Sequence, residues 1–375
     1  MRRKTRRYFA NLVFFGTALS LIIYLNRHQS NNKTFAWTTV RYKTTSNTLP
    51  KSRGTCPGLA NTSKPALVVS RVAADGDPKW LDQLTNLYHL CIYTVDAPPF
   101  PPPTTLQVPV NRGHEAMAYL TFLIDNYADI PTAGAVFIHG SRKAWHNDAP
   151  DYDNAALLAA LNVSAALAPS GYHNLRCDWS ASMCERSYAP PQGSLEVSLS
   201  AMLEPWNARA VSDAALPGAL AVLFGGERVL GRTDAVRAQC CAQFVVARER
   251  VWRHSRDEYV ALRQWLLDGS SDGRAEEQVR MGNVAPSDDR VAGRILSYLW
   301  HILFLQPEQD SSPGVQEGVG LDWLDNMACP RADDCYCRLY GRCNLPDCRT
   351  PGHCQGQYVL PPDFRLPDDL TATPM

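Results

Sequence analysis

The sequence lacks an excess of charge of either sign, because 37 lysines and arginines are matched by 37 aspartates and glutamates. A domain that binds nucleic acid usually shows a basic excess. The balance therefore argues against a nucleic-acid partner. Several catalytic motifs are absent as well: there is no G-x-S-x-G, no H-E-x-x-H and no G-x-x-x-x-G-K-[ST]. These absences argue against the common hydrolases and nucleotide-binding loops.

Long hydrophobic runs are also scarce, and the clearest one is at the N-terminus. Residues 8–25 carry no charge and follow the basic stretch MRRKTRR of residues 1–7. Eighteen helical residues span roughly 27 Å, enough for the hydrocarbon core of a bilayer. The basic flank should stay cytoplasmic. We expect a signal anchor in a single-pass type II protein of the Golgi or endoplasmic reticulum; the alternative is a cleaved signal and a secreted protein.

Two further features favour the secretory pathway. Glycosylation sequons begin at Asn32, Asn61 and Asn162, and the chain has 12 cysteines. Six of the cysteines fall within residues 329–354, where disulfides are favoured over a zinc site in an oxidising compartment. Cys177 and Cys184 are expected to close a small loop. Cys240 and Cys241 are not expected to pair with each other, because adjacent cysteines form strained bridges.

The remaining chain predicts three regions: a polar luminal linker at 26–64, an α/β domain at 65–310 and a cysteine-rich extension at 311–375. Apolar segments and amphipathic helices alternate in the domain, which is typical of a mostly parallel, Rossmann-like sheet flanked by helices. Strands are expected at 66–70, 90–96, 135–139 and 240–248. Helices are expected at 77–84, 111–127, 153–163, 255–269 and 288–304, with loops and short elements at 165–235.

The end of the strand at 135–139 is the first candidate site, because ligands bind at the carboxyl ends of parallel strands. The strand ends in His139-Gly140, and Trp145-His146-Asn147-Asp148 follows. His139, His146 and Asp148 have the donor types of a mixed metal site or of acid–base groups for a sugar or alcohol. The alternative is a satisfied buried histidine and a structured turn. Downstream, Asp151 and Asp153 either bind metal or cap the next helix.

Two helices carry the other candidates. Asn111, Arg112 and Gly113 precede a helix whose free N–H groups favour an anion, and Glu115 either caps that helix or takes part in catalysis. On the later helix, Arg290, Arg294, Ser297 and His301 fall on one face. This polar stripe is either a solvated face or a wall that binds diphosphate. Further candidate substrate contacts are Asn174, Gln243, Arg248 and Trp300.

The ordered motifs resemble a fungal family known as a domain of unknown function. The resemblance covers roughly residues 65–345. It is carried by LVVSR, NRGHEAMAYLTFLIDNY, VFIHG…WHND, GYHNLRC, CCAQFVVARERV, YLWHILF and CPRADDCYCRLYGRC. The family's helix motif usually reads GR-x-x-E-Y-x-W-H, whereas this chain has Ser297 at the glutamate position. If that glutamate is a catalytic base or a metal ligand, this copy is weakened or inactive; if it only pairs with an arginine, the change matters little.

The layout of that family is similar to GT-A glycosyltransferases. The similarity implies transfer of a sugar from a nucleotide-sugar donor to a glycan, glycoprotein or secreted metabolite, with Mn²⁺ or Mg²⁺ as candidate cofactor. Catalytic roles are expected for His139, Asp148, Glu115 and His301, and metal binding for His146 and Asp148. The alternatives are a non-catalytic glycan-binding or scaffold protein and a metal-dependent hydrolase. No Asp-x-Asp ends the 135–139 strand, which departs from the GT-A pattern.

Overall fold

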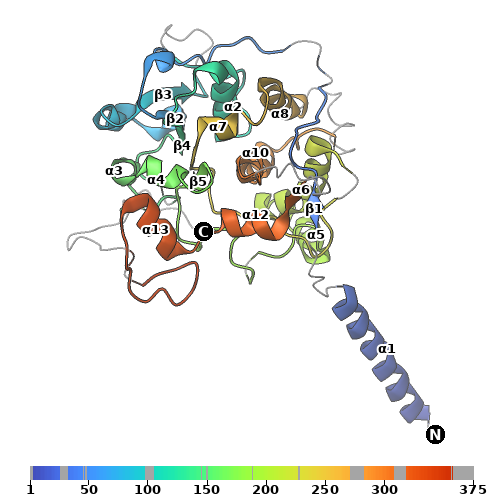
Figure 1. Ribbon diagram of the computed structural model, residues 1–375. Helices are drawn as coiled ribbons and strands as arrows, with labels where there is room; N and C mark the ends of the chain where they lie inside the picture. The colour runs from blue at the N-terminus through green and yellow to red at the C-terminus, as the bar shows by residue number, and fades with distance from the viewer. Residues whose placement is uncertain are drawn as a thin grey trace, which may run out of the picture.

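The protein folds around one mixed β-sheet with helices on both faces (Figure 1). The structure is a computed structural model. It describes residues 3–25, 33–44, 46, 49–97, 105–144, 146–148, 151–187, 189–226, 229–270, 283–307, 318–355 and 357. The α/β prediction is confirmed.

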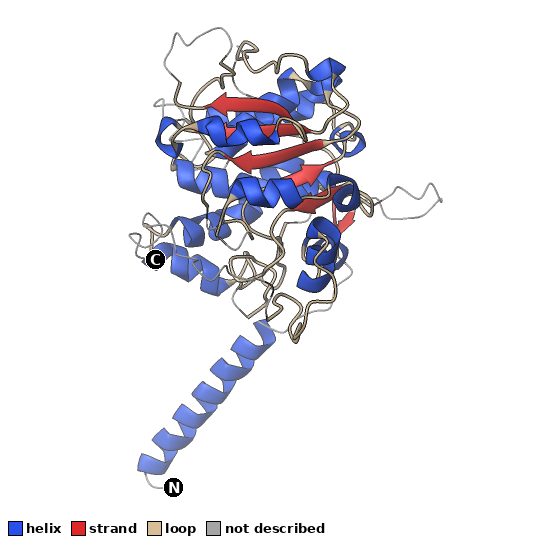
Figure 2. Cartoon of the chain, turned by 90° about the vertical axis from the view of Figure 1, so that its left-hand side faces the viewer, coloured by secondary structure: helices blue, strands red, loops and turns tan. Residues whose placement is uncertain are grey.

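Five strands form the central sheet in the order β3-β2-β4-β6-β5 (Figure 2). Their bounds are β2 Ala66–Arg71, β3 His89–Thr94, β4 Ala135–His139, β5 Tyr172–Asn174 and β6 Phe244–Val246. β2 pairs in parallel with both β3 and β4, while β6 runs antiparallel to β4 and β5. The strand predicted at 240–248 is therefore shorter than expected. Its direction was not predictable, because hydrophobic periodicity carries no information on strand direction.

Helices cover the sheet on both sides. The α-helices after the N-terminal one are α2 Glu115–Asp125, α3 Asn154–Ala160, α4 Val163–Leu167, α5 Leu195–Leu203, α6 Ala208–Phe224, α7 Arg248–Val251, α8 Arg256–Asp268, α10 Asp289–Ser297, α11 Leu299–Phe304, α12 Leu321–Ala328 and α13 Ala332–Tyr340. Short 3₁₀ turns are η1 Leu59–Asn61, η2 Ala73–Asp75, η3 Pro78–Leu84 and η4 Tyr127–Asp129. Side chains cap two of these elements: Asp77 caps η3, and Ser255 with Glu258 forms a capping box on α8.

The two faces of the sheet bury alternate residues of each strand, as the period of two requires. Val68 and Phe137 pack into the larger core, with α2, α8, α10 and α11. Leu67 and Val136 face a second core, which η3, α3 and α13 cover. The strands are apolar on both faces, and this is why the short runs at 66–70 and 135–139 could be recognised as buried strands.

The N-terminal helix α1, Arg3–Leu25, stands apart from the rest of the described chain (Figures 1 and 2). Its residues Arg6–Tyr24 are apolar enough to cross a membrane, and none of that stretch is buried in the fold. The helix is consistent with a membrane anchor or a signal sequence, and together with the disulfides it is consistent with a secretory-pathway protein.

Part of the predicted linker is packed into the domain, which corrects the linker boundaries of 26–64. Thr34–Phe35 forms strand β1, which pairs antiparallel with β7, Val319–Gly320. Phe35 and Trp37 are 1% and 2% exposed in the larger core. This segment was not recognised in the sequence, because its two aromatic residues stand among polar neighbours and form no hydrophobic period.

The helix predicted at 288–304 is divided in two, and this changes the predicted polar stripe. α10 ends at Ser297 and α11 begins at Leu299. The region 165–235, expected to be mostly loops, contains the 17-residue helix α6. Pro217 within α6 and the surrounding alanines obscured that helix, because proline is usually a breaker.

Every cysteine is paired, so the predicted pairing of Cys177 with Cys184 and the prediction that Cys240 does not pair with Cys241 are both wrong. Cys177 and Cys184 do not close a loop; they pair with Cys335 and Cys329 and attach the C-terminal helices to the domain. Cys240 pairs with Cys241, because all the other cysteines have partners elsewhere. The remaining disulfides are Cys56–Cys91, Cys337–Cys343 and Cys348–Cys354. Disulfides rather than zinc therefore account for the six C-terminal cysteines.

Candidate functional site

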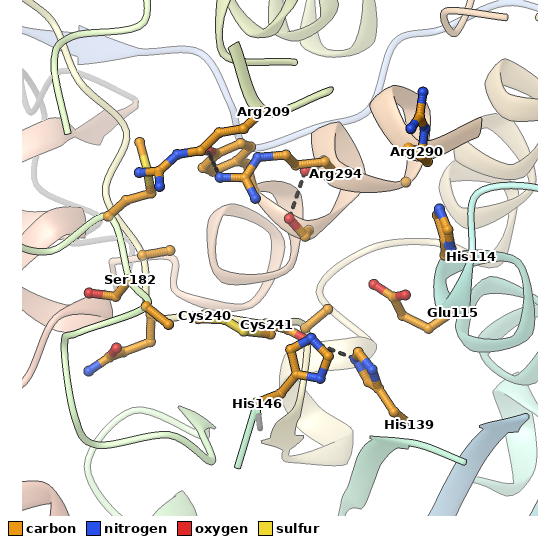
Figure 3. Close-up of a pocket in the computed structure, with 18 of the residues that line it drawn as sticks. His114, Glu115, His139, His146, Ser182, Arg209, Cys240, Cys241, Arg290 and Arg294 are labelled. Atoms are coloured by element: carbon orange, nitrogen blue, oxygen red, sulfur yellow. Dashed lines mark hydrogen bonds between the residues drawn. A yellow bond between two sulfur atoms is a disulfide. The ribbon is translucent and has the colours of Figure 1, made fainter. Parts of the chain in front are cut away.

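A pocket of about 760 Å³, lined by several charged and polar side chains, opens at the carboxyl end of β4 (Figure 3). Segments that are distant in sequence build it: the start of α2, the start of α6, one side of α10 and the loops around residues 180 and 240. The lining residues are His114, Glu115, His139, His146, Ser180, Ala181, Ser182, Met183, Arg209, Ala238, Gln239, Cys240, Cys241, Ala242, Arg290, Gly293, Arg294, Ser297 and Tyr298. The predicted position of the site, at the strand end, agrees with this pocket.

Two histidines form one side of the pocket. His139 ends β4, and its Nε2 lies 2.8 Å from the carbonyl oxygen of Cys241. The ring of His146 lies 5.0 Å from that of His139, centroid to centroid. Burial, together with the neighbouring His139 and Arg176, lowers the pKa of His146 to about 3. His146 is therefore a neutral hydrogen-bonding group at physiological pH.

The start of α2 supplies Glu115 to the same side of the pocket (Figure 3). The two residues before it, Gly113 and His114, have positive φ angles of 70° and 52°, so the chain turns sharply into the helix. The backbone N–H of Gly113 donates to Asp289 at 2.5 Å. A Cβ on Gly293 would lie 2.9 Å from the His114 ring, so the glycine lets α10 approach this turn closely. This packing fixes Glu115 opposite α10.

Three arginines form the other side, which we call the arginine wall: Arg209 of α6 with Arg290 and Arg294 of α10 (Figure 3). Their side chains remain 51%, 63% and 34% exposed. The Nη2 of Arg294 donates to the Tyr298 hydroxyl at 3.1 Å, and that hydroxyl donates to Asp213 at 2.5 Å. Arg294 is therefore oriented from behind, while its side chain remains part of the pocket lining.

The charge of the arginine wall is only partly neutralised. Asp213 lies 3.9 Å from Arg209 and 4.0 Å from Arg294, and it is buried. Burial raises the pKa of Asp213 above its usual range, against the opposing effects of Tyr298 and the two arginines. Arg290 pairs with Asp288. Three guanidinium groups thus share one buried and one exposed carboxylate, an arrangement that favours an anionic ligand.

The disulfide Cys240–Cys241 lies between the two sides and forms part of the pocket surface (Figure 3). Its position is fixed by the contact of Cys241 with His139. Beneath it, the Oε1 of Gln243 accepts from the backbone N–H of His139 at 3.4 Å. Gln243, predicted to contact substrate, therefore supports the end of β4 and does not line the pocket.

The predicted phosphate site before α2 has a different role. Arg112 is 7% exposed and donates to the backbone oxygens of Leu266, Gly269, Pro286 and Ser287. Its guanidinium group is fully engaged and faces away from the pocket, so the prediction of phosphate binding is wrong. Asn111 is exposed outside the pocket, and Gly113 is covered by Leu266.

Asp148 is the main correction among the predicted catalytic and metal-binding residues. Its exposed fraction is 0%, and its carboxylate accepts from the backbone N–H groups of Cys177 and Asp178. Asn147 is buried and donates to the Tyr152 carbonyl oxygen at 2.6 Å. The segment after His146 therefore turns inward, and both residues hold the fold.

Several other predicted residues also lie outside the pocket. Gly140 packs against Arg71, where a Cβ would come within 2.2 Å of the Arg71 Cβ. Asn174 is buried, and its side chain accepts from the backbone N–H of Arg176. Arg248 lies over the ring of Trp252, 4.6 Å from its centroid. Trp145 lies outside the described residues.

The break between α10 and α11 moves two predicted residues into the core. Trp300 packs against Tyr119 and Phe244. His301 is 1% exposed, and burial lowers its pKa to about 3. The prediction that His301 extends the polar face of Arg290, Arg294 and Ser297 into the site is therefore wrong.

Asp151 and Asp153 form ion pairs with basic side chains of the same chain. Asp153 caps α3 by accepting from Ala155, and it lies 2.9 Å from Arg142. Asp151 lies 2.7 Å from Lys143. The capping alternative is confirmed, and both carboxylates already have positive partners.

A divalent metal has no preassembled three-ligand site in the described part of the chain. There, three ligand atoms from histidine, cysteine, aspartate or glutamate come within 4.8 Å of one another only at Cys56, His89 and Cys91. The two sulfurs of that group are joined in a disulfide, so they offer no thiolate. Among the described residues, the donor atoms of His139, His146 and Asp148 do not converge on one point, so the metal-dependent hydrolase has no preassembled metal site there and stays a hypothesis.

Sequence reasoning missed Arg209, Tyr298, Asp213, His114 and the loop around Ser182. Tyr298 adjoins the predicted stripe, and its position directly after Ser297 was a usable signal. Arg209 and Ser182 had none, because they lie in the region where no periodicity was recognised.

Comparison with known families matches residues 67–338 to the family described as "protein of unknown function (DUF3431)". No curated protein and no solved structure matches the chain.

Proposed function

We propose, for a chain that belongs to the DUF3431 family over residues 67–338, that the pocket transfers a sugar from a nucleotide-sugar donor to a hydroxyl acceptor. The observation that carries the proposal is the arginine wall facing Glu115 and His139 across one cavity at the end of β4. The parallel core of β3, β2 and β4 with a ligand pocket at its carboxyl end supports a likeness to GT-A glycosyltransferases.

The arginine wall would bind the donor diphosphate. Guanidinium groups bind phosphate oxygens in a fixed fork, and they need no deprotonation at any physiological pH. Arg294 is best placed, because Tyr298 orients it and its charge faces the cavity. A volume of about 760 Å³ lies within the range of ligand sites for molecules of this size.

The transfer step uses the opposite side of the pocket. The acceptor hydroxyl oxygen forms a bond to the anomeric carbon while the bond from that carbon to the diphosphate oxygen breaks. The hydroxyl proton passes to the carboxylate of Glu115, and the electron pair of the broken bond stays on the departing nucleoside diphosphate. The arginine wall stabilises that developing charge. His139 and the neutral His146 hold sugar hydroxyls by hydrogen bonds.

The Mn²⁺ or Mg²⁺ expected from the resemblance does not fit the donors that face this pocket, so no step is derived through a metal. Glu115 is the sole carboxylate among the described lining residues. The arginines supply the positive charge that the departing diphosphate requires.

The proposed location is a secretory compartment, with α1 retained as a type II anchor and the remaining chain in the lumen of the Golgi or endoplasmic reticulum. The basic residues before the apolar stretch support this orientation. The acceptor would then be a glycan, a glycoprotein or a secreted metabolite.

The test is incubation of the full-length protein in detergent with a panel of nucleotide sugars, with and without Mn²⁺, while released nucleoside diphosphate is measured. We expect release with one donor class, and turnover that Glu115→Gln removes without loss of nucleotide binding. The matched control is Arg349→Ala, because Arg349 is exposed and pairs with Asp347 away from the pocket. Absence of both binding and turnover with every donor would refute the proposal.

A second candidate is a non-catalytic glycan-binding protein, and Ser297 favours it. The resemblance places a glutamate at this position, but the Ser297 hydroxyl donates to the Arg294 carbonyl oxygen at 2.7 Å and adds no carboxylate to the pocket. Thermal unfolding separates the two candidates: a nucleoside diphosphate should raise the midpoint of a transferase, whereas an oligosaccharide alone should raise that of a binder. Turnover that appears in Ser297→Glu and is absent from the natural chain would favour the binder.

A further inference from the structure

We propose that the outward face of α5, together with Trp206, docks onto the surface of the bilayer in which α1 is anchored. We call this surface the α5 face: Leu195, Leu199, Met202, Leu203 and Trp206. It goes beyond the proposed transfer reaction and rests only on the proposed retention of α1 as an anchor.

The α5 face is an apolar stripe on an otherwise polar surface. Leu195, Leu199, Met202 and Leu203 recur at the spacing of one helix face. The exposed fractions along the α5 face run from 50% to 73%, and Trp206 directly after the helix is 72% exposed. Val197 is the buried residue of α5, so the helix turns most of its apolar side outward. Soluble surfaces rarely leave such a contiguous group uncovered.

The chain holds this face close to the membrane anchor. α1 ends at Leu25, and the described fold resumes at Lys33. Eight residue steps reach at most about 28 Å even when fully extended. The point at which the chain enters the fold therefore stays close to the bilayer surface.

That entry point lies beside the start of α5. Lys33 pairs with Asp234 at 2.8 Å, and Asp234 accepts from the backbone N–H of Gly231 at 2.7 Å. Gly193, two residues before α5, packs so closely that a Cβ there would lie 2.4 Å from the Gly231 carbonyl oxygen. Figure 1 shows β1, which follows Lys33, next to α5 and α6. The short tether and the apolar stripe thus share one side of the domain.

The charge of the α5 face specifies the kind of membrane. α5 contains Glu196 and no lysine or arginine, and the exposed Glu204 follows it. The α5 face itself therefore offers no attraction to anionic headgroups, and its binding depends on insertion of leucine, methionine and tryptophan at the interface. The occupant is a bilayer with neutral headgroups. Docking also brings the pocket to the membrane surface, because Arg209 of the arginine wall lies three residues after Trp206.

The test uses the full-length protein in nanodiscs of phosphatidylcholine, either plain or brominated near the headgroup. Bromine quenches tryptophan fluorescence only at contact. α1 contains no tryptophan, and Trp206 is more exposed than Trp252 at 42% and Trp323 at 37%. We expect brominated lipid to quench part of the tryptophan fluorescence of the natural protein. The Trp206→Phe variant should lack that quenched part. Equal quenching in both proteins would overturn the proposal.

A second variant keeps the fluorophore. Leu199→Glu with Leu203→Glu preserves helix propensity and should abolish the quenching of Trp206 and shift its emission to longer wavelength. Leu87→Glu, at an exposed leucine outside α5, is the matched control and should change neither. Quenching that requires anionic lipid would contradict the neutral-headgroup assignment.

Two further outcomes are decisive. Quenching should persist in discs that hold a single copy of the protein; if it appears only with two copies, the face binds a second chain and the proposal fails. Intact mass should show residues 1–25 in the mature protein; a chain that begins after α1 would overturn the tethered arrangement. Neither measurement involves a nucleotide sugar, so this proposal and the transferase proposal fail separately.

Discussion

Two polar regions adjoin each other in this protein and behave in opposite ways. The pocket contains His139, His146, Glu115 and the arginine wall. The second region, which we call the buried polar cluster, contains Asp148, Arg176, Asp178 and Gln357, and the exposed His353 bonds to Asp178 from outside it. Only Asn147 separates His146 of the pocket from Asp148 of the cluster.

The difference lies in how the polar groups are satisfied. Asp148 is completely buried and accepts from two backbone N–H groups, and Asp178 accepts from Ser180, His353 and Gln357 at 2.7–2.8 Å. The arginine wall keeps a third to nearly two thirds of each side chain exposed. Residue type therefore does not distinguish a binding group from a structural one; the number of protein partners does.

Removing Asp148 should give the largest effect on stability. Asp148→Ala leaves two buried N–H groups and Arg176 without this carboxylate, so we expect a loss of about 3–5 kcal/mol in the free energy of unfolding. Urea unfolding followed by tryptophan fluorescence measures it. The control, Asp347→Ala, breaks a half-exposed pair with Arg349 and should cost less than about 1 kcal/mol. If the two variants are equally stable, Asp148 does not hold the fold.

Arg112 should behave as a member of the structural class. Arg112→Ala leaves four backbone oxygens without their donor, and we expect a loss of roughly 3 kcal/mol in the free energy of unfolding. Arg112→Lys should recover only part of it, since a lysine cannot reproduce the guanidinium fork. Nucleoside diphosphate affinity, measured by calorimetry on the folded protein, should stay unchanged in both variants. A loss of nucleoside diphosphate affinity without a loss of stability would show that Arg112 belongs to the binding site.

Arg294 should show the reverse pattern. Arg294→Ala removes a charged donor from the arginine wall, so the binding free energy of a nucleoside diphosphate should weaken by about 1.5–3 kcal/mol, roughly a factor of 10 to 150 in affinity. The free energy of unfolding should change little, because the side chain is partly exposed. Tyr298→Phe, which removes the group that orients Arg294, should weaken binding less. Unchanged nucleoside diphosphate affinity in Arg294→Ala would show that the arginine wall does not bind the nucleotide.

Acid should weaken the buried polar cluster through protonation of Asp178. Burial opposes ionisation of Asp178, but hydrogen bonds from His353, Ser180 and Gln357 outweigh it and lower its pKa from 3.8 to about 2. A lowered folded-state pKa contributes stability that is present above about pH 4 and lost as pH falls through about 2. The loss should be on the order of 2 kcal/mol. The free energy of unfolding, measured with urea at several pH values between 5 and 2, should therefore fall more steeply with decreasing pH for the natural chain than for Asp178→Asn. Equal slopes for the two proteins would contradict the lowered pKa of Asp178.

The predictable part of the site was its place in the fold. The strand at 135–139 is short, apolar and followed by His139, so the carboxyl end of a parallel strand could be recognised as a pocket. Glu115 and Arg294 were found because clear helix periodicity placed them on helices. Arg112, Asp148 and His301 were misassigned, because a sequence does not show which backbone groups a side chain will meet.

By itself, the sequence determined the apolar N-terminal helix, the strands β2, β3 and β4, and the helix α8. These depend on local periodicity and on hydrogen bonds between near neighbours. Only the tertiary structure decided the antiparallel direction of β6, the long-range pairs Cys177–Cys335 and Cys184–Cys329, and the meeting of Arg209 with Arg294. These contacts join residues separated by tens to more than a hundred positions. They form because burial of the whole core brings them together, and no short stretch of the chain contains that information.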